Sequence, residues 1–178
     1  MSRLIVPVGP RDHFEGPADA PVTLLEYGDF ECPGCGAAHP IVKELQRQLG
    51  SKLRLVFRHF PLTTMHAHAQ IAAEAAEAAG TQGRFWPMHD LLFEHQDALR
   101  DTDLLEYGTA LGLDVETFAA ELQRHVHAPR VRDDFLSGVR SGVNGTPTFY
   151  VNGRRHDGAA DLRSLSSSIE QALPAAEA

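Results

Sequence analysis

The order of apolar and polar positions predicts a strand, a helix and a second strand in the first third of the chain. Residues 22–25 form an apolar run that is typical of a strand covered on both faces. Residues 41–49 repeat apolar positions with the helical period, and Gly50 follows as a suitable helix end. In residues 52–58 apolar side chains alternate with basic ones, which indicates a strand. Strand, helix and strand at this spacing predict a βαβ unit, in which two parallel strands are joined by a right-handed crossover.

The middle of the chain carries helical periodicity over about seventy residues. The Ala- and Glu-rich first segment has Gly80 as a stop, and Asp114 is a suitable N-cap for a later helix. The predicted helices lie at 68–80, 84–96, 102–113, 114–126 and about 129–141.

The last third of the chain returns to strands. Residues 148–151 read as a strand, and Asn152-Gly153 is the strongest short signal for a hairpin turn. A partner strand is expected near residues 154–156 and a final helix at about 161–173. The first twenty residues, rich in Pro and Gly, predict an arm packed on the domain.

Composition and charge exclude several classes of protein. With 178 residues and 43% hydrophobic content, the chain suits one globular domain. The net charge of -8 provides no basic stripe for nucleic acid or an anionic membrane, so we expect neither partner. Apolar residues 4–8 are interrupted by Pro7 and fall short of a signal-peptide core. We expect a cytoplasmic protein, or a periplasmic one if a leader has been removed.

The two cysteines of the chain, Cys32 and Cys35, lie three positions apart where the first strand gives way to the first helix. Residues i and i+3 at a helix start face the same side, about 5–6 Å apart, so a disulfide closes with little movement. Such a short loop constrains the unfolded chain weakly, which argues against a structural clip. A redox pair, a metal site and two inert thiols are the alternatives, and this context favours the redox pair.

The position of each cysteine predicts its role. The first turn of a helix carries unpaired N–H groups and the positive end of the dipole, which stabilise a thiolate. We therefore expect a lowered pKa at Cys32 and assign it as the nucleophile. Cys35, one turn inside the helix and more buried, is the resolving thiol.

The ten histidines do not predict a metal site. A structural zinc site needs four ligands, so histidines would have to complete one that began with two thiols. His66 and His68 lie two positions apart and diverge by about 200° on a helix, and the six-residue spacing of His89 and His95 is also unfavourable. We expect no metal, and no cofactor other than the redox-active Cys32–Cys35 disulfide.

The segments GPADAPVTLLEYGDFECPGC, FRHFPL followed by His66, and GVNGTPTFYVNG occur in this order along nearly the whole chain. With them the sequence resembles the DsbA-like thiol–disulfide oxidoreductases of the thioredoxin superfamily. The resemblance and the element order imply an α/β thioredoxin-like fold, with a mixed sheet ordered β-α-β … β-β-α and an α-helical insertion. We expect a single unit, with residues 20–61 and 128–178 as the core and 62–127 as the insertion.

The resemblance also implies roles for residues outside the cysteine pair. Pro147 matches the family's cis-proline, which turns the backbone of Thr146 toward the sulfurs, where it can pair with substrate. Glu26 matches a buried acid that helps proton transfer at the second cysteine. A carboxylate in an apolar strand should independently have a raised pKa. Phe30 is expected to line an apolar rim for substrate, with a plain core position as the alternative. Pro33 and Gly34, the two positions between the cysteines, are also expected to bind substrate.

Gly34 departs from many relatives, which carry His or Tyr at this position. A histidine there stabilises the thiolate of Cys32, and a bond of about 1.5–3 kcal/mol corresponds to about 30–60 mV. Gly34 therefore predicts a weaker oxidant than the histidine-bearing members.

The function expected from these features is that of an enzyme which exchanges disulfides with protein or small-thiol substrates through Cys32-Pro33-Gly34-Cys35. An unidentified redox partner recycles the pair. The alternative is a non-catalytic redox switch or a Cys/His metal-binding module, and glutathione-dependent transfer is a third reading that the second cysteine disfavours.

Overall fold

A computed structural model describes residues 2–174, and its strands form one mixed sheet in the order β1-β3-β2-β4-β5. The central strands β2 (Val22–Gly28) and β3 (Leu53–His59) are parallel. β4 (Thr148–Val151) runs antiparallel to β2, and β5 (Arg154–Arg155) closes the predicted hairpin. The predicted βαβ unit and hairpin are therefore confirmed.

The arm predicted for the first twenty residues contains a strand that the sequence pattern does not reveal. β1 (His13–Glu15) pairs antiparallel with the outer edge of β3. Three residues are too few to show an alternating pattern. The pairing covers an edge that would otherwise expose backbone donors and acceptors.

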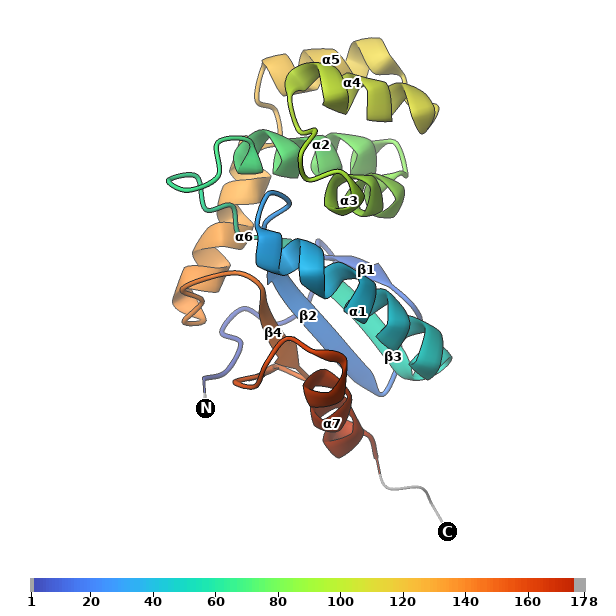
Figure 1. The fold of residues 1–178 in the computed structure, drawn as a ribbon, viewed down its shortest axis with the longest axis vertical. Coiled ribbons are helices and arrows are strands. Elements are labelled where there is room, and N and C mark those ends of the chain that lie inside the picture. Colours follow the sequence, from blue (N-terminus) through green and yellow to red (C-terminus); the bar gives the residue numbers. More distant parts are fainter. Residues whose placement is uncertain (1, 175–178) are drawn as a thin grey trace.

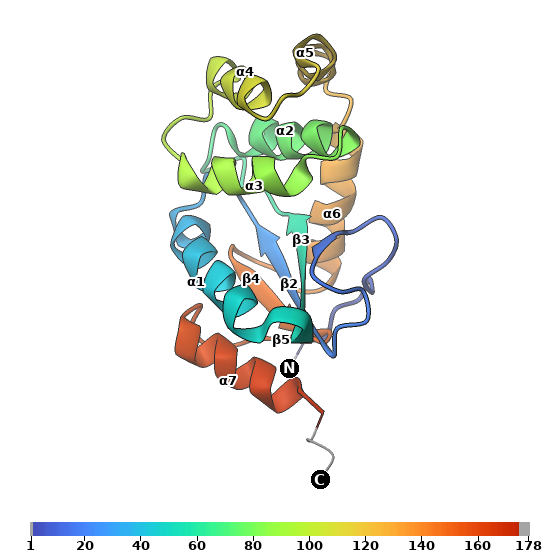
Figure 2. The ribbon, with the colours of Figure 1, turned by 90° about the vertical axis from the view of Figure 1, so that its right-hand side faces the viewer.

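Helices cover both faces of the sheet (Figure 2). α1 (Pro33–Leu49), followed by the short 3₁₀ helix η1 (Gly50–Lys52), lies with α7 (Leu162–Ala172) on one face, and α6 (Ala128–Arg140) lies on the other. Successive residues of β2 point to opposite sides. Leu24 accordingly packs under α1 and α7, while Leu25 packs toward the face covered by α6.

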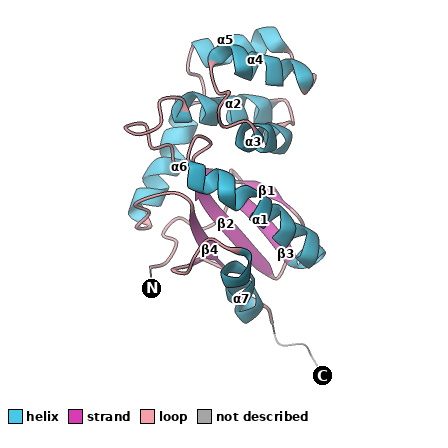
Figure 3. Cartoon of the chain, viewed as in Figure 1, coloured by secondary structure: helices cyan, strands magenta, loops and turns pink. Residues whose placement is uncertain are grey.

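The other helices form a block above the sheet (Figures 1 and 3). It consists of α2 (Ala69–Thr81), α3 (Phe85–Glu94), α4 (Asp101–Ala110) and α5 (Val115–Gln123). The amino-terminal end of α1 lies directly beneath this block, and α6 leads from it back to the sheet (Figure 1). Within residues 2–174, no helix has the length and apolar content needed to cross a bilayer.

Two details of helix ends test the sequence expectations. Asp114 is the N-cap of α5, and its side chain accepts a hydrogen bond from the Thr117 N–H, as predicted. Gly80 was expected to stop α2, but the helix continues to Thr81 and the residue with positive φ, +75°, is Gly83. A Cβ on Gly80 would lie 3.2 Å from the His13 ring, so this glycine permits close packing against β1.

Candidate active site

The two cysteines lie at the amino-terminal end of α1, where the sequence predicts them. Cys32 is the N-cap residue of α1 and Pro33 opens the helix, so Cys35 lies in the first turn. Both are free thiols; Cys32 is 8% exposed and Cys35 is fully buried. The sulfur of Cys32 is therefore the one that a partner molecule can reach.

Hydrogen-bond donors converge on the sulfur of Cys32 and lower its pKa from 9.0 to about 5. The largest cause is a hydrogen bond from the Cys35 thiol. Burial opposes the shift, while the Thr146 hydroxyl and the main-chain N–H groups of Cys35 and Gly34 support it. The Thr146 hydroxyl is buried and has no hydrogen-bond partner in this structure, so its proton is free to turn toward the sulfur when the thiolate forms. Cys32 is consequently a thiolate at neutral pH.

The second thiol and the buried acid have the opposite character. Burial, the hydrogen bond to Cys32 and the charge of Glu26 raise the pKa of Cys35 far above its usual range. Burial, followed by repulsion from Cys32, raises the pKa of Glu26 to about 8. Glu26 lies in β2 between Phe57 and Phe149 on the neighbouring strands, and its Oε1 has no hydrogen-bond partner. A nucleophilic thiolate, a protonated thiol and a neutral carboxyl are thus held together.

The loop before β4 lies against the cysteine pair. The Thr146–Pro147 peptide bond is cis, as expected. When Cys32 is protonated, its thiol donates a hydrogen bond to the Thr146 carbonyl at 3.4 Å, so this main chain faces the sulfur. A Cβ on Gly34 would lie 3.3 Å from Cδ of Pro147. Pro33 and Gly34 are both exposed beside this loop, in the place expected of substrate-binding residues.

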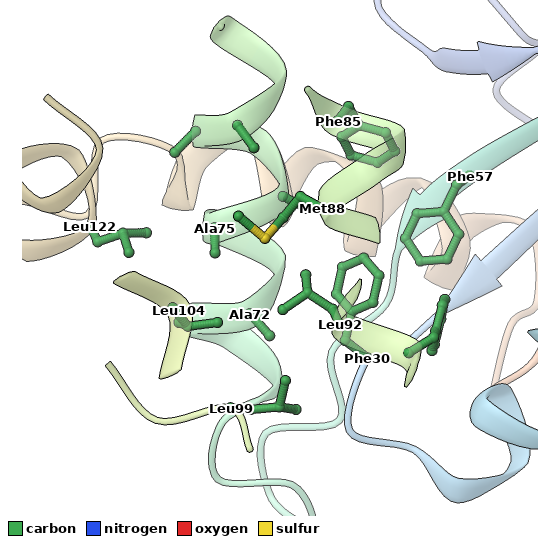
Figure 4. Packing of buried hydrophobic residues seen from close by; sticks show 14 of the residues in the cluster. Phe30, Phe57, Ala72, Ala75, Phe85, Met88, Leu92, Leu99, Leu104 and Leu122 are labelled. Carbon is green, nitrogen blue, oxygen red and sulfur yellow. The ribbon is translucent and has the colours of Figure 1, made fainter. Parts of the chain in front are cut away.

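The expectation that Phe30 lines a substrate rim is wrong. Its side chain is 1% exposed and lies in the apolar cluster between the sheet and the helical block (Figure 4). Ring centroids of Phe57 and Phe93 lie 5.2 and 4.8 Å away. Phe30 precedes the exposed part of the loop, and the helical block, which is remote in sequence, covers it.

Gln96, a residue that the sequence does not identify, fixes the backbone of the nucleophile. Its amide nitrogen donates to the carbonyls of Phe30 and Cys32, at 2.9 and 2.8 Å. The amide packs against Gly36 so closely that a Cβ there would lie 2.0 Å from its oxygen. No sequence signal reveals this contact, because it joins α1 to the segment that follows α3.

Two carboxylate–histidine pairs join the active-site loop to the segment that precedes α2. Oδ2 of Asp29 lies 2.8 Å from Nδ1 of His66, and Oε1 of Glu31 lies 2.9 Å from Nδ1 of His68. Asp29 also accepts hydrogen bonds from the main-chain N–H groups of Glu31 and Leu62. These contacts hold the segment beside Cys32, and neither carboxylate was among the predicted site residues.

In the described part of the chain, two groups of side chains have the proximity needed for a metal, and neither contains a cysteine. They are His39 with His89 and Asp90, and His59 with Glu77 and Asp134. In each group the aspartate already forms an ion pair with a basic side chain outside the group: Lys43 lies 2.7 Å from Asp90, and Arg130 pairs with Asp134. These groups join separate elements, so spacing along one helix does not reveal them.

Comparison with known proteins gives one family. The profile of a Thioredoxin family matches residues 9–171. Among curated proteins, a relative from Salinispora arenicola named Na(+)/H(+) antiporter NhaA 1 is 53% identical over 96% of this chain. Another from Herminiimonas arsenicoxydans, named Na(+)/H(+) antiporter NhaA, is 46% identical over 92%. The chain spans about a quarter, 26%, of the length of these two relatives, whose names describe much longer proteins.

Solved structures give the same fold. BdbD from Bacillus subtilis, in its oxidised form, superposes with a TM-score of 0.81 at 26% identity, covering 89% of this chain and 91% of BdbD. A thioredoxin-like oxidoreductase from Silicibacter pomeroyi gives 0.78 at 29% identity, covering 92% and 93%. Wolbachia pipientis alpha-DsbA1 gives 0.79 at 20% identity, covering 94% and 93%. The predicted thioredoxin-like fold is therefore confirmed.

Proposed function

Since the chain belongs to the DsbA-like thiol–disulfide oxidoreductases of the thioredoxin superfamily, we propose that it exchanges disulfides with protein or small-molecule thiols through Cys32 and Cys35. The observation that carries the proposal is the opposite shift of the two thiols. Cys32 ionises at about pH 5 within reach of solvent, while Cys35, one turn away, is buried and remains protonated. The thiolate is the attacking species in disulfide exchange.

In the reducing direction, the Cys32 thiolate attacks one sulfur of a substrate disulfide. A mixed disulfide forms and the other substrate sulfur leaves as a thiolate. Cys35 then loses its proton and attacks Cys32, which closes the Cys32–Cys35 disulfide and releases the second substrate sulfur. The substrate gains two electrons, and the protein dithiol is oxidised by two. The oxidising direction is the same sequence in reverse.

Glu26 is suited to move the proton of Cys35. Repulsion from the Cys32 thiolate is one cause of its raised pKa. This repulsion disappears when Cys32 enters the mixed disulfide, so the pKa of Glu26 falls and its carboxyl releases a proton to solvent. The carboxylate that results can then accept the proton of Cys35. An acid with a pKa near neutrality exchanges protons in both directions.

The cis-proline loop is suited to hold the substrate. The main chain of Thr146 faces Cys32, and the neighbouring Pro33 and Gly34 are exposed. An extended substrate segment would pair with this main chain while its disulfide lies over Cys32. A further redox protein recycles the pair.

The proposal is tested by catalysed reduction of insulin disulfides by dithiothreitol, with Cys32→Ser as the decisive variant. Wild type should accelerate the reaction, and Cys32→Ser should reduce the rate to the uncatalysed level because the attacking sulfur is gone. Cys35→Ser should form a mixed disulfide that persists, since no second thiol resolves it. Alkylation of Cys32 by iodoacetamide should follow an apparent pKa near 5.

The alternative functions give different results in the same assays. A redox switch would form the Cys32–Cys35 disulfide without accelerating insulin reduction. A Cys/His metal module would retain zinc after purification and lose it in Cys32→Ser. Either outcome would reject the enzymatic proposal.

A further inference from the structure

A large cavity lies away from the cysteine pair. Its volume is about 950 Å³, and it is enclosed by the end of β4, by β5 with the loop that follows, and by α7. Val151 in its lining pairs with Leu24, whereas Cys32 follows the other end of β2. Figure 2 shows β5 and α7 at the end of the molecule away from the helical block. The proposed disulfide exchange therefore makes no use of this cavity.

The wall of the cavity between β5 and α7 is held by hydrogen bonds. Nδ1 of His156 lies 2.8 Å from the hydroxyl oxygen of Ser168 in α7, and Nε2 lies 3.0 Å from the carbonyl oxygen of Ala159. Asp161, the N-cap of α7, accepts a hydrogen bond from the Ser164 N–H. The loop is thus attached to the helix at both ends, and the cavity is formed before any ligand enters.

The charges in the lining leave a positive excess. Arg154, Arg155 and Arg163 line the cavity together with Asp157 and Asp161. Asp157 is compensated by Arg155, at 3.4 Å, and the charge of Asp161 lies at the positive end of the α7 dipole. Arg154 and Arg163 make no ion pair within residues 2–174. This excess is a local exception in a chain whose net charge is -8.

A second arginine lies directly opposite Arg154. Arg3 pairs with it in an antiparallel bridge, where the Leu4 N–H donates to the Gly153 carbonyl at 2.9 Å. Opposite residues point to the same face of a sheet, and like charges placed in this way repel each other. Val151, the hairpin partner of Arg154, packs in the cluster beneath α1 and α7, so both arginines belong to the face that carries α7. An anion bound at this face relieves the repulsion.

We infer that this cavity binds the phosphate group of a small polar molecule, with Arg154 and Arg163 as its ligands. A guanidinium group presents a fork of N–H donors that matches phosphate oxygens. A phosphate monoester carries a charge of about -1.5 to -2 at pH 7, so it suits two arginines better than a single carboxylate does. The Ser167 hydroxyl and the Gln171 amide in the same lining are available to the rest of the molecule.

The inference is tested by NMR titration of the isotope-labelled full chain with glucose 6-phosphate, glucuronate and glucose. These probes share a sugar ring and carry a phosphate, a carboxylate and no charge. Glucose 6-phosphate should shift the signals of Arg154, Arg163 and Ser167, with a Kd below about 1 mM. Glucuronate should bind about tenfold more weakly because it has one charge fewer, and glucose should not bind.

Matched variants separate this site from general attraction to arginine. Arg154→Gln and Arg163→Gln, both at exposed positions, should each weaken the binding of glucose 6-phosphate about tenfold. Arg132→Gln removes the same charge from the exposed surface of α6, outside the cavity, and should leave the binding unchanged. All three variants should reduce insulin at the wild-type rate, because the cavity does not contact the cysteine pair.

Several results would overturn the inference. They are the absence of saturable shifts with glucose 6-phosphate, equal affinity for glucuronate, unchanged binding in Arg154→Gln, and equal weakening in Arg132→Gln. The inference does not depend on disulfide exchange. A wild-type protein without insulin turnover would reject the proposed function and leave the phosphate site untouched.

Discussion

At the scale of single residues, Glu26 shows how a β-sheet imposes an unusual state on an ordinary side chain. It lies in β2, and the residues opposite it on the two neighbouring strands are Phe57 and Phe149. The residue is 3% exposed, and one carboxyl oxygen has no partner. Charging it there costs free energy, because no hydrogen bond or cation replaces the lost water. The neutral form is therefore held up to about pH 8.

Glu26→Gln should make the protein more stable, by an amount that grows with pH. Below pH 4.5 the carboxyl is protonated in both folded and unfolded states. Between pH 4.5 and about 8 the unfolded state has lost the proton that the folded state retains, so stability falls as pH rises. Urea unfolding of the oxidised protein, in which the cysteines do not titrate and burial alone raises the pKa of Glu26, should show a gain on the order of 2 kcal/mol between pH 4.5 and 7.

The exposed Glu106→Gln serves as the control for this series, and its effect should not vary with pH in the same way. A Glu26→Gln gain of equal size at pH 4.5 and pH 7 would show that the carboxyl is not held neutral by the fold.

At the scale of elements, the start of α1 depends on the segment that follows α3. Gln96 replaces water as the partner of two loop carbonyls, and Gly36 leaves room for its amide. A glycine inside a helix normally costs about 1 kcal/mol relative to alanine. This glycine is explained by the contact that it permits, because a Cβ would displace the amide from the active-site loop.

Gly36→Ala should therefore destabilise the protein, against the usual preference of helices. The gain in helix propensity, about 1 kcal/mol, is outweighed by loss of two hydrogen bonds worth about 1 kcal/mol each. A net loss of about 1 kcal/mol in chemical denaturation is expected, and Gln96→Ala should cost more because it brings no propensity gain. Ala37→Gly, at the exposed next position, measures the cost of a glycine in α1 away from Gln96. A Gly36→Ala protein more stable than wild type would show that the contact between Gln96 and the active-site loop does not stabilise the fold.

At the scale of the whole molecule, the redox state of two sulfurs is coupled to the stability of the fold. Only the folded structure brings Thr146, from the loop before β4, to the sulfur at the start of α1. The thiolate is favoured in the folded protein and disfavoured in the unfolded chain. Reduced and oxidised proteins must therefore differ in how their stability depends on pH.

The reduced protein should gain stability over the oxidised protein as pH rises from 5 toward 9. In this window Cys32 is ionised when folded and protonated when unfolded, so its contribution is complete above pH 9 and is lost as pH falls through about 5. Repulsion between the thiolate and Glu26 removes part of the gain. Unfolding curves with and without dithiothreitol should diverge by on the order of 2 kcal/mol between pH 5 and 7. Cys32→Ser should abolish the divergence, and parallel curves in wild type would refute the lowered pKa.

The sequence by itself determined the order of elements and the identity of the cysteine pair. Periodicity located α1, β3 and the helical block, because each apolar pattern is local and repeats over several residues. The Asn152-Gly153 turn likewise depends on neighbours in the chain, whereas the cis bond before Pro147 was expected only from the family resemblance. The spacing of Cys32 and Cys35 at a helix start was enough to predict that Cys35 is the more buried of the two.

Tertiary structure alone decided what surrounds that pair. Phe30 is core because helices remote in sequence cover it, and β1 exists because the edge of β3 was available to pair. The contacts of Gln96 with Cys32 and of His66 with Asp29 join segments more than thirty residues apart. A local pattern reports which face of an element is apolar, but the partner of that face depends on how distant elements pack. The electrostatic surroundings of Cys32, and hence its pKa, are consequently a property of the folded chain.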